Sequence, residues 1–307
     1  MLSYSKGQAV VFWLKSLLLF IVGSVVGLML VAVVTGAVMA MQGEEVNTGS
    51  LNGIAHNPWS IVLGNALAWI ALMVWEIKRL RLSRAKALVM RARPFLRFVP
   101  VAVIGLGVPV IATNLDAAVE ILLPMPESFR DAMGSFCDVL AHPAGALLAL
   151  VVIAPVTEEV IFRGFILRGL LNHGTSARTA VMLSALLFGV MHLNPWQGAG
   201  AFCMGLVFGW VYLRTRSLAL CMTLHAINNG VSVAAMNWPG LGKFLGATDP
   251  NVAEFTPWWL NVTGVVLLVG GLAWLRFLTR AGPPADDLAP ANAGILPAGS
   301  KLGTPIS

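Results

Sequence analysis

The chain has 307 residues, of which 57% are hydrophobic and only 11% are charged, and its net charge is +6. Soluble domains carry about 25% charged residues, so the composition excludes an ordinary soluble protein and predicts a protein that crosses the membrane several times. The positive charge does not require a nucleic-acid partner, because membrane proteins concentrate Lys and Arg on one side. Cys137, Cys203 and Cys221 have no metal-binding spacing and predict no disulfide framework.

The first apolar run extends from Ser16 to Met41, after Lys6 and Lys15. The hydrophobic region of a signal peptide has only about 7–15 residues, so this longer run is predicted to be a retained first span. Within it, Gly23 and Gly27 have the small-xxx-small spacing of a helix contact face.

A spanning helix needs about 20 mostly apolar residues. Eight segments meet this requirement, some of them loosely: 16–41, 58–76, 98–121, 144–167, 179–195, 198–213, 217–237 and 256–275. Because backbone polar groups inside a bilayer must be paired within the segment, these spans predict an all-α fold. The fifth and sixth segments are short and close together in sequence. They predict a tight helical hairpin in which Pro195 ends the fifth helix.

Positive charges indicate the orientation of these spans. Seventeen of the 20 Lys and Arg residues fall at the N-terminus, after the last span or in alternate loops, and eight of them lie in residues 78–97. By the positive-inside rule, both termini are predicted to be cytoplasmic. The basic segment 78–97 could also bind anionic lipid. Residues 281–307 are rich in Pro, Ala and Gly and are predicted to be a disordered cytoplasmic tail, which leaves a transmembrane domain over residues 1–280.

The fourth segment contains Glu158, Glu159 and Arg163 at a depth where ionisable groups are costly and usually face a cavity. Adjacent helix positions point about 100° apart, so the two glutamates cannot share a direction. Glu159 and Arg163 are four residues apart and can pair, which would leave Glu158 free. Pro155 lacks an N–H and can loosen the helix next to Glu158.

Two further segments carry polar side chains in similar positions. His192 follows Phe188 in the fifth segment, and His225 shares a helix face with Asn229 in the seventh. Counted from the basic ends of their helices, Glu158, His192 and His225 lie about 15, 21 and 13 Å deep. We therefore expect these side chains to converge in one pocket.

A carboxylate and a histidine in a dry pocket can activate a shared water, while an Asn amide and a His N–H can stabilise an oxyanion. This set could hydrolyse an amide without a covalent intermediate. Two other interpretations stay open. The cluster could be the structural core of a non-enzymatic membrane protein such as an immunity or maturation factor, or it could be the relay of a proton-coupled transporter.

The three motifs read EEVIFR (158–163), FGVMH (188–192) and HAINN (225–229), in that order. They resemble the E-E-x-x-x-R, F-x-x-x-H and H-x-x-x-N motifs of the CAAX protease and bacteriocin-processing family, also called CPBP or Abi. The members of this family are intramembrane glutamic endopeptidases. The resemblance covers about residues 144–237, which would form the catalytic core.

The resemblance implies a role for each motif residue. Glu158 and His192 would activate water, and His225 and Asn229 would hold the oxyanion. Glu159 and Arg163 would shape the site, and Phe188 would pack beside it. The resemblance implies a reaction without a cofactor, although zinc on Glu158, His192 and His225 is an alternative.

The resemblance also implies the class of substrate and the location. Eukaryotic members remove the last three residues of prenylated CAAX proteins, and bacterial members act more diversely. The expected partners are a membrane-associated protein or peptide substrate and the lipid bilayer. The expected location is the cytoplasmic membrane of a bacterium.

Overall fold

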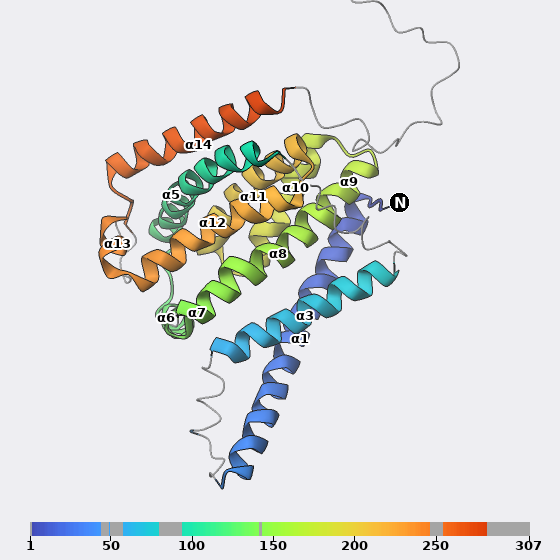
Figure 1. Ribbon diagram of the computed structural model, residues 1–307, viewed down its shortest axis with the longest axis vertical. Coiled ribbons are helices and arrows are strands. Elements are labelled where there is room, and N and C mark those ends of the chain that lie inside the picture. Colours follow the sequence, from blue (N-terminus) through green and yellow to red (C-terminus); the bar gives the residue numbers. More distant parts are fainter. Residues whose placement is uncertain are drawn as a thin grey trace, which may run out of the picture.

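The computed structural model describes residues 2–43, 49, 58–79, 94–140, 143–245 and 254–280. Throughout these ranges the chain forms helices and short connections, with no strand (Figure 1). Five of the described helices are long and apolar enough to cross a membrane: Lys6–Met41, Phe95–Leu122, Pro143–Asn172, Leu218–Asn237 and Trp258–Leu278. The protein is therefore an all-α polytopic membrane protein. The predicted tail, 281–307, and residues 80–93 of the basic segment lie outside the described residues.

All eight predicted segments contain helix. In chain order the structure has α1 (Lys6–Met41), α3 (Pro58–Arg79), α5 (Phe98–Leu122), a fourth helix (Pro143–Asn172), α10 (Ala177–Met191), α11 (Pro195–Thr215), α12 (Leu218–Asn237) and α14 (Trp258–Leu278). A short 3-10 turn, η1 (Phe95–Arg97), precedes α5. Two shorter helices, α6 (Glu127–Leu140) and α13 (Pro239–Phe244), were not predicted. The motifs lie on the fourth helix, on α12 and along α10 to its C-terminal cap.

The fourth helix changes its winding along its length. It consists of α7 (Pro143–Ala146), η2 (Leu147–Ile153), α8 (Ala154–Glu159), η3 (Val160–Leu167) and α9 (Arg168–Asn172), of which η2 and η3 are π-helical. π-helical turns in proteins are rare and often occur at functional sites. Every residue of η3 is buried, as its nearly uniform apolar sequence predicts. Pro155 lies in the first turn of α8, directly after η2, so the predicted loosening coincides with an irregular stretch.

Helices α5 and α14 pack closely and in opposite directions. A Cβ on Gly107 would lie 2.6 Å from the carbonyl oxygen of Gly264, so this contact requires glycine. Near the start of α14, Asn114 Nδ2 donates to Thr256 Oγ1 (2.8 Å) and to Asn261 Oδ1 (2.7 Å). Small residues and a paired polar network thus hold these helices together, as is common between membrane helices.

Helices α10 and α11 form the predicted tight hairpin, but Pro195 does not end the fifth helix. Helix α10 ends at Met191, and Pro195 begins α11, with the Asn194 side chain accepting a hydrogen bond from the N–H of Gln197. The reason is that proline suits the first position of a helix, where its missing N–H has no partner to lose. The two helices of the hairpin pack closely: a Cβ on Gly205 would lie 2.8 Å from Cα of Ala185 in α10.

Helices α1 and α3 pack against each other, and the C-terminal half of α1 extends away from the other helices (Figure 1). Gly23 of α1 lies directly against Ala68 of α3, and Gly27 is buried, in agreement with the predicted contact face. Many large apolar side chains of α1, such as Met29 and Val33, are exposed. This exposure is what a helix surrounded by lipid requires.

The segment before α1 is bound to the end of the fourth helix. Tyr4 N–H donates to the Gly169 carbonyl (2.9 Å), and Asn172 Nδ2 donates to the Leu2 carbonyl (2.8 Å). Tyr4 O–H donates to Glu76 Oε1 of α3 at 2.6 Å. Burial, followed by the hydrogen bond to Glu76, raises the pKa of Tyr4 above its ordinary value, so the phenol stays a proton donor.

The end of α11 is similarly bound to the end of α14, because Arg214 donates to the Thr279 carbonyl oxygen at 2.6 Å. These contacts bring the basic end of α11 to the basic end of α14, as the predicted alternation of loops requires. Which membrane face these ends occupy stays a prediction.

Candidate active site

The centre of the site is a fully buried ion pair on the fourth helix. Arg163 donates to Glu159 Oε1 at 2.9 Å, and neither side chain is exposed to solvent. Arg163 also donates to the Gly205 carbonyl at 3.1 Å, and its guanidinium lies 4.8 and 5.1 Å from the ring centres of Phe188 and Phe208. The predicted pairing of Glu159 with Arg163 is therefore present, and it joins the fourth helix to α11.

His225 of α12 also contacts the carboxylate of this ion pair. Its Nδ1 lies 3.0 Å from the same Glu159 oxygen that binds Arg163, and its Nε2 lies 3.9 Å from Glu158 Oε2. A carboxylate against Nδ1 fixes the tautomer and the orientation of an imidazole. Glu159 thus directs the Nε2 edge of His225 toward Glu158.

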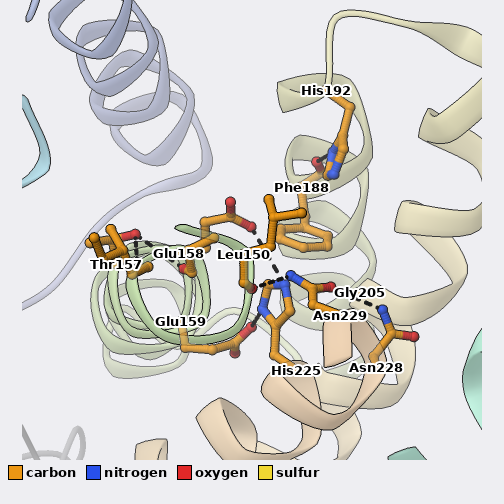
Figure 2. A network of polar contacts seen from close by, with 12 residues as sticks. Leu150, Thr157, Glu158, Glu159, Phe188, His192, Gly205, His225, Asn228 and Asn229 are labelled. Carbon is orange, nitrogen blue, oxygen red and sulfur yellow. Dashed lines mark hydrogen bonds and ion pairs between the residues drawn. The ribbon is translucent and has the colours of Figure 1, made fainter. Parts of the chain in front are cut away.

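The two adjacent glutamates have different environments, as their positions on a helix predict. The Glu159 side chain is fully buried and bound to Arg163 and His225, whereas that of Glu158 is 22% exposed. Figure 2 shows that the two carboxylates leave the helix on different sides and that His225 approaches them from a neighbouring helix. Glu158 is consequently the glutamate that can meet a water or a substrate.

The structure places His192 differently from the sequence prediction. His192 was expected within the fifth span, but it is the C-terminal cap residue of α10, because the helix ends at Met191 and Leu193 takes a positive φ of 54°. Its Nδ1 lies 3.0 Å from the Phe188 carbonyl oxygen. This contact leaves Nε2 available for a water or a substrate.

Phe188 separates the two histidines. Its ring packs edge-on to His192 (5.4 Å between ring centres) and edge-on to His225 (5.8 Å), as Figure 2 shows. Among the contacts of the described residues, none joins His192 directly to Glu158. The two side chains would therefore act together only through a bound molecule such as water.

Asn229 is held by a main-chain group of the fourth helix. Its Nδ2 donates to the Leu150 carbonyl in η2 at 2.8 Å, and its Oδ1 accepts from Nδ2 of the adjacent Asn228 at 3.1 Å. The sequence prediction included Asn229 but missed both of these partners. Asn228, the first Asn of HAINN, was a visible signal for one partner, while no side chain could mark a carbonyl as the other.

The alternative zinc ligands, Glu158, His192 and His225, are not grouped around one point. Among the described residues, no group of three or more His, Cys, Asp or Glu side chains is placed to hold a metal ion. Cys203 and Cys221 are free cysteines, and nothing is described for the side chain of Cys137. The polar groups that do converge are a partly exposed carboxylate, an oriented imidazole and an amide, which are suited to acid–base chemistry on a carbonyl group.

Comparison with known proteins identifies the family of this site. Residues 140–231 match the family described as type II CAAX prenyl endopeptidase Rce1-like. The chain belongs to the CAAX protease and bacteriocin-processing family. The matched range contains all three motifs, so this family member is, in general terms, a CAAX-type intramembrane protease that acts on a membrane-associated protein.

The chain is 30% identical over 120 residues to an uncharacterised protein of Treponema pallidum (strain Nichols), with 33% of this chain and 67% of that protein covered. No solved structure matches the chain.

Proposed function

We propose that this protein is a glutamic intramembrane endopeptidase, in which Glu158 activates a water that attacks a peptide bond. The proposal rests on the different environments of the two neighbouring glutamates. Glu159 is occupied by Arg163 and His225, whereas Glu158 is partly exposed and faces the Nε2 edge of His225. A base must be free to accept a proton, and Glu158 meets this condition.

In the proposed reaction, Glu158 takes a proton from water while His192 holds the same water through Nε2. The resulting hydroxide attacks the peptide carbonyl carbon. Asn229 donates its remaining N–H to the oxyanion, and His225, held by Glu159, would face the same oxyanion with its Nε2 edge. The C–N bond then breaks as the leaving nitrogen takes the proton from Glu158, which restores the carboxylate and releases a carboxylic acid and an amine.

The proposal includes the surroundings of the enzyme. The substrate would be a protein or peptide attached to the membrane, prenylated or not, and the reaction would need no metal. The cytoplasmic membrane of a bacterium is the proposed location, with both termini on the cytoplasmic side. The similarity to a protein of Treponema pallidum supports the bacterial source, and the basic residues of the loops support the orientation.

Replacing Glu158 by Gln tests the proposal. The purified protein in lipid nanodiscs would be given a quenched peptide that ends in a CAAX sequence, in farnesylated and unmodified forms. We expect Glu158→Gln to lower kcat at least about 100-fold, because the general base is lost while the shape of the side chain stays. Activity of the wild type should survive a chelator.

Glu120→Gln is the matched control, because Glu120 pairs with Arg130 and does not contact the site. This variant should cleave like the wild type. Full activity of a folded Glu158→Gln protein, or no cleavage of either peptide by the wild type, would contradict the proposal. Loss of activity with chelator, restored by zinc, would contradict its metal-free part.

A further inference from the structure

Asn228 and the Leu150 carbonyl form, with Asn229, a hydrogen-bonded chain that ends at the candidate active site (Figure 2). A main-chain carbonyl can only accept, so Leu150 must face the NH2 group of Asn229. The Oδ1 of Asn229 must then point the other way, where it meets the NH2 group of Asn228. The direction of every hydrogen bond in the chain is therefore fixed by one carbonyl.

The Leu150 carbonyl is available because of the winding of the fourth helix. At the end of η2 the Ala154 N–H bonds to Ala149 rather than to Leu150, as π-helical pairing requires. The same pairing would assign Leu150 to residue 155, but that residue is Pro155, which has no N–H. Asn229 supplies the donor that the helix cannot provide.

The side-chain amide of Asn228 lies in a buried position, where an amide lowers the stability of the fold. It is 5% exposed, and its Oδ1 is buried without a hydrogen-bond partner among the described residues. A buried polar atom without a partner destabilises the fold, because it has lost its hydrogen bonds with water and gained none in the protein. An apolar residue of similar size would avoid this cost, so the stability of the fold does not explain an Asn at this position.

We propose that Asn228 is a positioning residue, which holds the Asn229 amide so that its second N–H faces the oxyanion formed in the reaction. This inference rests on the proposed function, because it gives Asn228 no role except through Asn229. Without the Asn228 donor, Asn229 would keep one restraint, the Leu150 carbonyl, and its amide plane would be free to rotate about that single hydrogen bond.

The test compares activity with stability in the variants Asn228→Leu, Asn229→Ala and the double variant, using the same two quenched peptides. We expect Asn228→Leu to lower kcat about tenfold with KM nearly unchanged, and Asn229→Ala to lower it about 100-fold. The double variant should be no slower than Asn229→Ala. Asn228→Leu should also unfold at the same or a higher temperature, since the unpaired Oδ1 is gone.

Asn237→Leu is the matched control, because Asn237 lies on the same helix and its side chain donates to the carbonyl of Val233 in that helix. It should cleave like the wild type. The inference is overturned if Asn228→Leu has the kcat of the wild type, or if its effect persists in full beside Asn229→Ala. Should the Leu variant fail to fold, Asn228→Ala in the same cycle gives the same two outcomes. Full activity of Asn229→Ala would instead refute the oxyanion part of the proposed function.

Discussion

At the scale of single residues, the Glu159–Arg163 pair determines how the site is held. Both charges are fully buried, and His225 and the Gly205 carbonyl are bound to them. Burying two charges is expensive, and the expense is offset only while both partners are present. The pair therefore acts as a unit whose loss should affect folding before it affects chemistry.

Removing one partner of this pair is predicted to destabilise the protein strongly. Arg163→Met should lower the free energy of unfolding by about 3–5 kcal/mol, because it leaves the Glu159 charge buried without its partner. The double variant Glu159→Leu/Arg163→Met should be less destabilised than Arg163→Met. Thermal unfolding in detergent micelles, followed by tryptophan fluorescence, would measure both.

The Glu120–Arg130 pair is the control for this prediction, because its side chains are 19% and 27% exposed. Arg130→Met should cost no more than about 1 kcal/mol. Equal losses for Arg163→Met and Arg130→Met would show that the buried pair is not special.

Residue spacing alone predicted part of this site. The four-residue separation of Glu159 and Arg163 predicted their pairing, and the adjacency of Glu158 and Glu159 predicted that one would be left free. The contact between His225 and Glu159 was not predictable, because it depends on how α12 is rotated about its axis. The Leu150 carbonyl could not be predicted either, since it required knowledge of the π-helical winding.

At the scale of elements, the π-helical turns of the fourth helix link its backbone hydrogen bonding to the candidate active site. Hydrophobic periodicity predicted a helix here, but it does not distinguish α-helical from π-helical turns. Pro155 was the only local sign of irregularity. Likewise, the end of α10 was predicted too late, because Pro195 was read as a helix stop when it is the start of α11.

Replacing Pro155 by Ala restores the missing N–H donor, and this change should lower activity without lowering stability. In Pro155→Ala, the new N–H can bond to the Leu150 carbonyl and compete with Asn229. We expect an unchanged or higher unfolding temperature and a kcat lower by about 10- to 100-fold, because the Asn229 amide is displaced. Both quantities would be measured on the same nanodisc preparation.

Pro109→Ala is a suitable comparison, because Pro109 is also a buried proline within a helix, and it lies in α5, which carries none of the three motifs. It should change the unfolding temperature without lowering kcat. If Pro155→Ala keeps the full kcat, the Leu150 carbonyl is not needed to place Asn229.

At the scale of the whole molecule, the arrangement of charges gives a testable topology. The ends of α11 and α14 that carry Arg214 and Arg276 lie together, and the predicted topology assigns α6 (Glu127–Leu140) to the opposite set of loops. Composition predicted the membrane class and the eight helical segments, because both depend on apolar content and length. The tilt of each helix depends on packing, which composition does not encode.

Labelling of single cysteines from outside the cell would check this topology. In a chain without its native cysteines, Glu127→Cys should react with a membrane-impermeant maleimide, because α6 is predicted to lie outside. Arg178→Cys, at the start of α10, should react only after the membrane is opened. Both positions are exposed, so accessibility would reflect membrane side rather than burial. The reverse pattern would invert the proposed orientation.

The length of α1 has a consequence for how the protein depends on its lipids. Its 36 residues extend about 54 Å, whereas the hydrocarbon layer is about 30 Å thick. One end of this helix is held by the contacts of Leu2 and Tyr4 with the fourth helix, so the excess must be absorbed by inclination or by protrusion at the other end. Acyl-chain length would thus set the slope of α1 and of its companion α3, and a thinner or thicker bilayer would turn this pair relative to the helix that carries Glu158.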